Sequence, residues 1–225
     1  IKSLGATIEW SDTQQLTINT KDVNPGNLNE ELVKKMRSSV LLIGPLLARF
    51  KKITIPEPGG CFLGNRPLDT HFSVLKQFGA HIEKNKTRKG KTTYTITLKE
   101  LRGADITMPE FSVTATENAI ILGALATGKT TIRLAAQEPH IQNLITFLDA
   151  AGGEIRERAV NTIKMNGVSR LRGVAQRIIP DMLETGTLAV AAALVGRGVI
   201  LYNIEPAHLD MVFLKLKAIG VKFEI

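Results

Sequence analysis

The stretch Phe78-Gly79-Ala80-His81-Ile82 decides the fold, because variants of it recur along the chain at a spacing of about 70 residues. The other copies are Leu4-Gly5-Ala6-Thr7-Ile8, Ala151-Gly152-Gly153-Glu154-Ile155 and Ile219-Gly220-Val221-Lys222-Phe223. Copies follow amphipathic runs, such as residues 69–78 or 140–150, and precede alternating runs, such as residues 92–98. Because glycine readily adopts the left-handed conformation that ends helices, the pattern predicts a helix, a glycine cap and then a strand.

A second phrase keeps the same period and combines an Ala/Leu-rich run, a tight basic turn and a strand-like run. Its copies are Leu46 to Ile55, Ala124 to Ile132 and Ala193 to Ile200. We interpret each copy as a buried helix followed by a strand, so that each repeat holds two helices and several strands. One such unit cannot bury both faces of its sheet, and the copies must pack on one another. The sequence therefore predicts an α/β (α+β) fold of tandem repeats, with three repeat lengths present.

The composition of the 225 residues is that of a globular protein, with 44% hydrophobic and 22% charged residues. Aromatic residues make up only 5%, so we expect an aliphatic core. The net charge of +8 favours anionic partners, which are nucleic acids, membrane lipids or phosphorylated small molecules. The lysine-rich segment from Lys84 to Lys91 has no interleaved aromatic residues that could stack on bases. A solvated hairpin loop is therefore a better interpretation of it than a nucleic-acid patch.

Cysteine content and hydropathy indicate the compartment. The only cysteine is Cys61, which excludes an internal disulfide and makes a reducing cytoplasm the simplest location. No apolar run approaches the ~20 residues that a membrane helix needs, and the longest tract, around Leu188 to Val195, is short and Ala-rich. We expect neither a membrane segment nor a secretion signal.

Residues Gly123 to Thr130 match the P-loop string of Gly, four residues and Gly-Lys-Thr. A P-loop needs a strand, a glycine loop and then a helix, so that the helix N-terminus meets the phosphates. Here residues 115–126 have the pattern of a helix and residues 130–134 that of a strand, which is the reverse order. We therefore do not interpret the string as a nucleotide triphosphatase motif.

The segment from Pro58 to His71 interrupts the first repeat between its strand and its second helix, where the other repeats have far shorter connections. Insertions in one copy of a repeat often carry function. Cys61 has Arg66 five residues on and His71 ten residues on, and cations near a thiol lower its pKa and make it reactive. The alternative is that Cys61 is a small buried hydrophobic residue, that Asp69 is a helix N-cap and that His71 lies on the surface of the first helical turn.

The segment Pro58-Gly59-Gly60-Cys61 to Gly64-Asn65-Arg66-Pro67-Leu68-Asp69-Thr70-His71 resembles the catalytic loop of the UDP-N-acetylglucosamine enolpyruvyl transferase family. Three further stretches resemble the same family, so that the resemblance runs along essentially the whole chain. They are Met36 to Phe50, Phe111 to Asn118 and Pro180 to Thr187. The cysteine loop distinguishes this family from the sister family that acts on shikimate 3-phosphate and shares the repeats.

The resemblance implies an inside-out α/β barrel architecture of two lobes, each of three repeats, which close over the substrates. It implies transfer of the enolpyruvyl group of phosphoenolpyruvate to the 3-hydroxyl of UDP-N-acetylglucosamine, the first committed step of peptidoglycan synthesis. The hydroxyl adds, and phosphate is then eliminated. Protonating carbon 3 of the enol ether requires a positioned acid, and arginine forks suit a carboxylate and a phosphate. The expected partners are these two small molecules, with no cofactor, metal, nucleic acid or membrane.

On the phosphoenolpyruvate side, the resemblance makes Cys61 the acid and the transient covalent partner of the substrate. Arg37 and Arg66 would hold its phosphate and carboxylate, with Arg66 also near the nucleotide. The resemblance further implies that fosfomycin, a phosphonate epoxide, would alkylate Cys61.

On the nucleotide side, the resemblance implies a uridine-lining segment and a turn with backbone donors for the diphosphate. The residues concerned are Pro67, Leu68 and Asp69, then Ser112, Val113 and Thr114. At the position of Thr114 a smaller residue, often glycine, would be expected. Further candidates for the site are His71, Asp181 and Glu184.

We expect a lobe boundary near residue 180, with residues 1–179 forming the catalytic-loop lobe and residues 180–225 the first part of the second lobe. The chain opens and closes at the same phase of the repeat, and the family's N-terminal Lys-Asn pair, general-base aspartate and late arginines have no counterpart in it. We therefore expect a fragment or a shortened relative that holds half of a site. The alternative is a non-catalytic relative that binds a nucleotide-sugar or a protein partner.

Overall fold

The computed structural model describes residues 1–59, 67–86 and 90–225, which fall into two compact units. The first unit is Ile1–Val174 and the second is Ala175–Ile225. Within the described ranges, no helix has the length and apolar character that crossing a bilayer requires.

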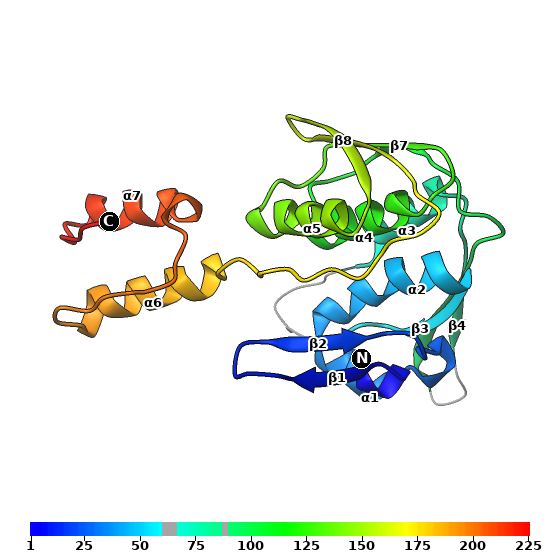
Figure 1. Ribbon diagram of the computed structural model, residues 1–225, viewed down its shortest axis with the longest axis horizontal. Helices are drawn as coiled ribbons and strands as arrows, with labels where there is room; N and C mark the ends of the chain where they lie inside the picture. The colour runs from blue at the N-terminus through cyan, green and yellow to red at the C-terminus, as the bar shows by residue number, and fades with distance from the viewer. Residues whose placement is uncertain (60–66, 87–89) are drawn as a thin grey trace. The chain divides into compact units, whose positions relative to one another are not determined.

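The first unit is a mixed arrangement of helices and strands (Figure 1). Its helices are η1 (Lys2–Leu4), η2 (Pro25–Asn27), α1 (Glu30–Lys35), η3 (Arg37–Leu42), α2 (Ile43–Phe50), α3 (Asp69–Gln77), α4 (Val113–Ala124) and α5 (Pro139–Ala150), where η marks a 3-10 helix. Its strands are β1 (Thr7–Trp10), β2 (Leu16–Asn19), β3 (Lys52–Pro56), β4 (His81–Lys86), β5 (Thr92–Thr97), β6 (Asp105–Thr107), β7 (Lys129–Arg133), β8 (Glu154–Ala159) and β9 (Thr162–Asn166). The predicted α/β class is confirmed.

The strands form a hairpin, β1-β2, and two larger sheets with orders β3-β5-β4 and β6-β7-β9-β8. In both larger sheets, a strand leads through a helix into a hairpin, and the last strand of that hairpin pairs antiparallel with both earlier strands. Lys52 and His81 both pair with Thr97, as Lys129 and Glu154 both pair with Asn166. β6 adds to the second sheet in parallel with β7. Over the ranges described, none of these sheets closes into a barrel.

The core of the first unit is aliphatic, as predicted, and α4 lies at its centre. Eight of the twelve residues of α4 are buried, and this helix contacts α2, α3 and α5 (Figure 1). The largest fully buried side chains are mostly isoleucine and leucine, among them Ile43, Leu47, Ile96, Ile120 and Ile132. The Ala-rich composition of α4 follows from this position, because small side chains allow neighbouring helices to approach closely.

The predicted order of helix, glycine and strand is confirmed after α3 and after α5. Gly79 and Gly152 follow these helices with φ angles of 86° and 99°, in the left-handed region where side chains are strained. The P-loop string also has the predicted order, because α4 precedes the turn and β7 follows it. The predicted hairpin is confirmed, because β4 pairs antiparallel with β5. Lys84 to Lys86 belong to the strand β4 rather than to the loop, and residues 87–89 lie outside the described residues.

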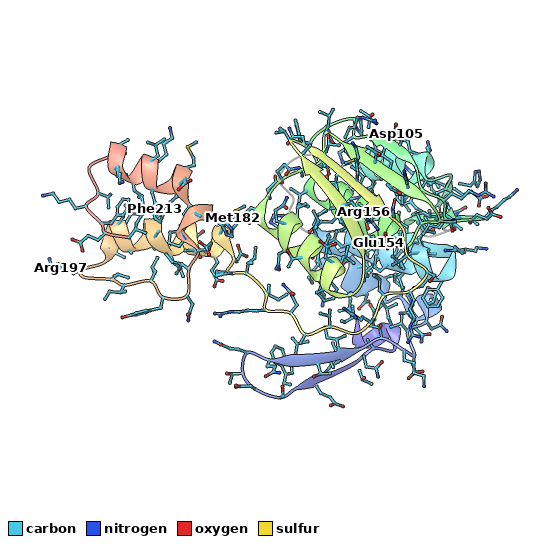
Figure 2. The ribbon with its side chains drawn as sticks, turned by 45° about the horizontal axis from the view of Figure 1, so that its top comes forward. Asp105, Glu154, Arg156, Met182, Arg197 and Phe213 are labelled. Carbon is cyan, nitrogen blue, oxygen red and sulfur yellow. The ribbon has the colours of Figure 1, made fainter. Side chains whose placement is uncertain are left out.

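The second unit contains α6 (Met182–Val195), η4 (Pro206–His208) and α7 (Asp210–Ala218). Phe213, labelled in Figure 2, contacts Phe223 with ring centroids 5.2 Å apart and ring planes tilted by 34°. Three predictions were wrong here: α6 buries only Thr185 and Gly186, and no strand follows Gly198 or Gly220. A strand needs a hydrogen-bonding partner, and the described residues of this unit contain none. The lobe boundary expected near residue 180 stays a prediction.

Candidate functional site

The candidate site residues of the first unit come from three segments: η3, the start of α3 and the start of α4. The predicted acid Cys61 and the predicted ligand Arg66 lie outside the described residues. The arrangement of the other candidates therefore rests on Arg37, on residues 67–71 and on residues 112–114. Two of these segments, η3 and α3, contact the buried helix α4, and the first residues of α4 form the third segment.

Arg37 is the first residue of η3 and reaches the segment that precedes α3. Its Nη2 donates a hydrogen bond to the carbonyl oxygen of Pro67 at 3.3 Å. Pro67 is exposed, whereas the next residue, Leu68, is only 4% exposed and belongs to the core. The structure thus brings two of the predicted ligand residues, Arg37 and Pro67, into direct contact.

Asp69 is exposed and begins α3, so the alternative role predicted for it was wrong. The residue in the N-cap position is Leu68, and no side-chain cap hydrogen bond forms. Because Asp69 already has helical geometry, its carboxylate cannot cap the helix as an N-cap side chain does. Its charge still lies at the positive end of the helix dipole.

The turn from Ser112 to Thr114 starts α4 and presents a helix N-terminus. Ser112 is the N-cap, and its Oγ accepts a hydrogen bond from the Ala115 backbone N–H at 3.4 Å. The first N–H groups of a helix have no acceptor within the helix, and with the helix dipole they favour anions. The backbone of this turn can therefore receive a phosphate or carboxylate group.

His71 is buried rather than on the surface, because α3 packs its first turns against α4. It is 4% exposed, and its Nε2 lies 3.1 Å from the Thr114 hydroxyl oxygen. Its Nδ1 lies 3.3 Å from the side-chain nitrogen of Asn118. Burial, followed by the positive charge of Arg37, lowers the pKa of His71 to about 4. His71 is therefore neutral at pH 7.

The sequence predicted no role for Asn118, although its side chain hydrogen-bonds to Gly44, Val40 and His71. It is 2% exposed, and its Oδ1 accepts from the Gly44 backbone N–H at 2.7 Å. Its Nδ2 donates to the Val40 carbonyl oxygen at 3.2 Å. An asparagine within an Ala/Ile-rich helical run was the signal that could have found it, because buried polar groups need partners.

Two glutamates were also missed, Glu117 of α4 and Glu138 at the residue before α5. Burial, followed by the charge of Glu138, raises the pKa of Glu117 to about 7. Thr116 accepts a hydrogen bond from the Ala136 backbone N–H at 3.1 Å, which ties this part of α4 to the segment that carries Glu138. The Oε2 atom of Glu138 is buried and has no hydrogen-bond partner among the described residues.

Asp181 and Glu184 belong to the second unit. Asp181 is the N-cap of α6, where its Oδ1 accepts from the backbone N–H groups of Leu183 at 2.7 Å and Glu184 at 3.3 Å. This cap accounts for Asp181 structurally, and Glu184 is exposed in the first turn. In the part of the chain that the structure describes, no group of three or more His, Cys, Asp or Glu side chains could hold a metal ion.

The fold of this chain is that of enolpyruvyl transferases. The structure of the enolpyruvyl transferase NikO from Streptomyces tendae superposes on this chain with a TM-score of 0.79 and 20% sequence identity. The match covers 100% of this chain and 53% of the NikO chain. EPSP synthase from Acinetobacter baumannii matches 97% of this chain with half of its own length, at a TM-score of 0.67 and 24% identity. At these identities the likeness concerns the fold alone.

Sequence comparison gives the family. The sequence profile of EPSP synthase (3-phosphoshikimate 1-carboxyvinyltransferase) matches residues 1–224, and the chain belongs to this family. It is 41% identical over 220 residues to UDP-N-acetylglucosamine 1-carboxyvinyltransferase 1 of Carboxydothermus hydrogenoformans, covering 98% of this chain and 51% of that protein. It is 39% identical over 212 residues to UDP-N-acetylglucosamine 1-carboxyvinyltransferase 2 of Staphylococcus epidermidis, covering 94% of this chain and 50% of that protein. The chain spans about half the length of these curated relatives.

Proposed function

We propose that this chain is the catalytic-loop half of a UDP-N-acetylglucosamine enolpyruvyl transferase. The observation that carries the proposal is the 41% identity along 98% of the chain to a relative of that name. In the proposed reaction, the oxygen of the sugar 3-hydroxyl gives up its proton and forms a bond to carbon 2 of phosphoenolpyruvate, while carbon 3 takes up a proton as the double bond is lost. Loss of that proton and departure of inorganic phosphate then restore the double bond.

Each candidate residue has a chemical task in this reaction. Cys61 supplies the proton to carbon 3, and its sulfur bonds transiently to carbon 2 and leaves before the sugar oxygen bonds there. Arg66 holds the anionic groups beside it. Arg37 shares that task, and its hydrogen bond to the Pro67 carbonyl keeps its guanidinium at the segment that leads out of the loop. The start of α4 receives the diphosphate, which suits the free N–H groups of a helix N-terminus.

The setting of the complete protein is also proposed. Residues 1–179 belong to one lobe and residues 180–225 begin a second, in an inside-out barrel built from tandem repeats. The shared strand order of β3-β5-β4 and β7-β9-β8 supports the repeats. Such a protein acts in the cytoplasm, commits sugar nucleotides to peptidoglycan, and thereby serves cell shape and division. Fosfomycin would inactivate it through Cys61.

A second candidate function is binding of the nucleotide-sugar without turnover. It is favoured by the contact between Arg37 and Pro67 and by the turn from Ser112 to Thr114, because both belong to the first unit by itself. Phosphate release from phosphoenolpyruvate in the presence of UDP-N-acetylglucosamine, measured on a full-length protein that carries this chain, separates the two functions. A transferase releases phosphate and loses this activity in Cys61→Ala, whereas a binding protein releases none.

The binding step is tested by titrating UDP-N-acetylglucosamine into the chain by NMR or calorimetry. We expect weak binding that Asp69→Asn weakens further. Asp210→Asn is the matched control, because Asp210 begins α7 after Leu209 as Asp69 begins α3 after Leu68. Equal affinity of Asp69→Asn and wild type would count against the nucleotide assignment.

The reactivity of Cys61 is tested with iodoacetamide at neutral pH. We expect alkylation faster than that of free cysteine, and slower alkylation in Arg66→Ala, because a nearby cation favours the thiolate. Arg102→Ala is the control, since Arg102 is exposed and pairs with Glu100. A thiol that resists alkylation in the folded protein would be a buried structural cysteine, and its catalytic assignment would fall.

A further inference from the structure

One buried amide joins all three segments that carry candidate ligand residues. Asn118 of α4 bonds to Val40 of η3, to Gly44 at the start of α2 and to His71 of α3. His71 in turn bonds to Thr114, at the start of α4. We call these four side-chain contacts the Asn118 network.

The backbone fixes the orientation of the Asn118 side chain. The Gly44 N–H can only donate, so the atom 2.7 Å from it is the oxygen. The Val40 carbonyl can only accept, so the atom 3.2 Å from it is the nitrogen. Exchanging the two atoms would place donor against donor and acceptor against acceptor. The second hydrogen on the Asn118 nitrogen is thereby directed to His71.

This orientation determines where His71 carries its proton. Its Nδ1 faces the Asn118 amide nitrogen at 3.3 Å and must accept a hydrogen bond. A neutral imidazole that accepts at Nδ1 carries its hydrogen on Nε2. The Nε2–H group lies 3.1 Å from the Thr114 hydroxyl oxygen and donates to it. The hydrogen bonds therefore run in one direction: Asn118 donates to His71, and His71 donates to Thr114.

We infer that Asn118 and His71 are positioning residues, which hold the start of α3 and the ligand-binding turn of α4 in fixed register through one imidazole tautomer. The ligand part of this inference rests on the proposed function. Thr114 is the last acceptor in this series of hydrogen bonds. Its hydroxyl therefore has a structural use at a position where the resemblance implies a smaller residue. Arg37 is the charged group whose field reaches His71, and Glu110 bonds to the adjacent Thr70.

Close packing around Gly44 supports the network. A Cβ atom on Gly44 would lie 2.7 Å from the Asn118 Oδ1 and 3.3 Å from the Asn118 Cα. The backbone of α2 therefore approaches α4 closely enough for the 2.7 Å hydrogen bond only because residue 44 has no side chain. Three elements are thus held around one amide whose hydrogen-bonding groups are all used.

The first arm of the test needs no ligand. The chain has four histidines, so ¹⁵N NMR of the imidazole groups can resolve His71. In wild type we expect the Nε2–H tautomer and no titration above about pH 5. In Asn118→Asp, a carboxylate faces Nδ1, and we expect an Nδ1–H group and a His71 pKa raised by about two units. The matched control Asn143→Asp, on α5, should leave His71 as in wild type.

The second arm measures UDP-N-acetylglucosamine affinity. Asn118→Asp should weaken it about tenfold, and Thr114→Val, which keeps the shape of the side chain and removes the hydroxyl, about fivefold. Thr114→Ser should restore it. Thr114→Val also keeps the test decisive if Asn118→Asp does not fold, because the His71 Nε2 signal must change when its acceptor is lost.

The outcomes of the two arms are distinguishable. An Nδ1–H tautomer in wild type, or a His71 pKa near 6.5, would overturn the inferred network. Wild-type affinity in Asn118→Asp and Thr114→Val would overturn the positioning role. If wild type shows the expected tautomer but binds no UDP-N-acetylglucosamine, the proposed function fails while the network stands.

Discussion

The region from β3 to β5 and the region from β7 to β9 have the same strand order but different connections between the first strand and its helix. Residues 57–68 connect β3 to α3, whereas residues 134–138 connect β7 to α5. The antiparallel pairing of the first strand with the last, the helix and the glycine that follows it correspond in both, although β8 has a register shift against β9 that β4 lacks against β5. The candidate chemistry lies in the longer connection. The comparison teaches that the pairing framework stays constant while the connection differs in length, and the longer one contains the candidate residues Cys61 and Arg66.

The two connections also give α4 two different electrostatic neighbours. On the side of the first connection, burial and the Arg37 charge lower the pKa of His71. On the side of the second, burial and the Glu138 charge raise the pKa of Glu117. Both shifts favour the neutral form, because charged groups lose hydration when they are buried. At pH 7 the central helix thus contacts one neutral base, His71, and itself carries one partly neutral acid, Glu117.

The largest expected effect tests whether the two sheets rest on equivalent cores. Ile96 and Ile163 lie on the central strands β5 and β9, are 0% and 1% exposed, and pair with Ile53 and Ile132. Replacing either with alanine should lower the free energy of unfolding by about 3 kcal/mol, through lost burial and a residual cavity. Urea denaturation followed by circular dichroism measures this.

A matched control for these two variants is Val160→Ala. Val160 is 90% exposed, so this change should cost less than about 0.5 kcal/mol. If Ile96→Ala and Ile163→Ala differ from each other by more than a factor of two, the two sheets are not energetically equivalent. The comparison between the regions would then hold for topology only.

Local patterns were predictable from the sequence, and contacts between distant segments were not. The helix, glycine and strand after residue 78 could be predicted because periodicity and the left-handed glycine are local properties. The burial of His71 could not, because it depends on α4, which lies some 40 residues further along the chain. α6 shows the same limit: its composition resembles that of α4, but within its unit it has no comparable core to cover it.

The second prediction concerns the acid beside the short connection. Because the pKa of Glu117 is raised from 4.5 to about 7, the folded state binds a proton that the unfolded state has released between these values. The stabilising contribution is fully present below about pH 4.5 and is lost as pH rises through 7. We expect the free energy of unfolding to fall by about 1 kcal/mol between pH 5 and pH 8, after allowance for the partial exposure of Glu117.

Two variants divide this pH dependence between its causes. Glu117→Gln should remove it, since the amide does not titrate. Glu138→Gln should reduce it only in part, because burial is the larger cause of the shift. Denaturation curves at four pH values suffice to measure both. An unchanged slope in Glu117→Gln would assign the pH dependence to another group.

The third prediction compares the glycines that end α3 and α5. Gly79 and Gly152 have positive φ angles, and a Cβ atom at either position would meet nothing within 4 Å. Alanine at each position is therefore strained only through its backbone conformation, and each change should cost about 1 kcal/mol. Gly173→Ala is the control, because its Cβ also meets nothing within 4 Å and its φ is not in the left-handed region. Thermal denaturation of the three variants should show equal losses for the first two and none for the third.

The smallest expected effect concerns the exposed pairs at the start of β4 and β8. His81 Nε2 lies 3.3 Å from Glu83 Oε1, and Arg156 Nη2 lies 2.6 Å from Glu154 Oε2 (Figure 2). The hydrogen bonds from Arg156 and Asn166 lower the pKa of Glu154, so any stability from that pair is present near neutral pH and is lost on acidification. Solvent screens both pairs, and exposed ion pairs contribute little to stability. Glu83→Gln and Glu154→Gln should therefore leave the thermal midpoint unchanged at pH 7, in low salt and in 0.5 M salt alike. A drop for Glu154→Gln that appears only in low salt would mean that the second sheet, unlike the first, draws stability from its surface charges.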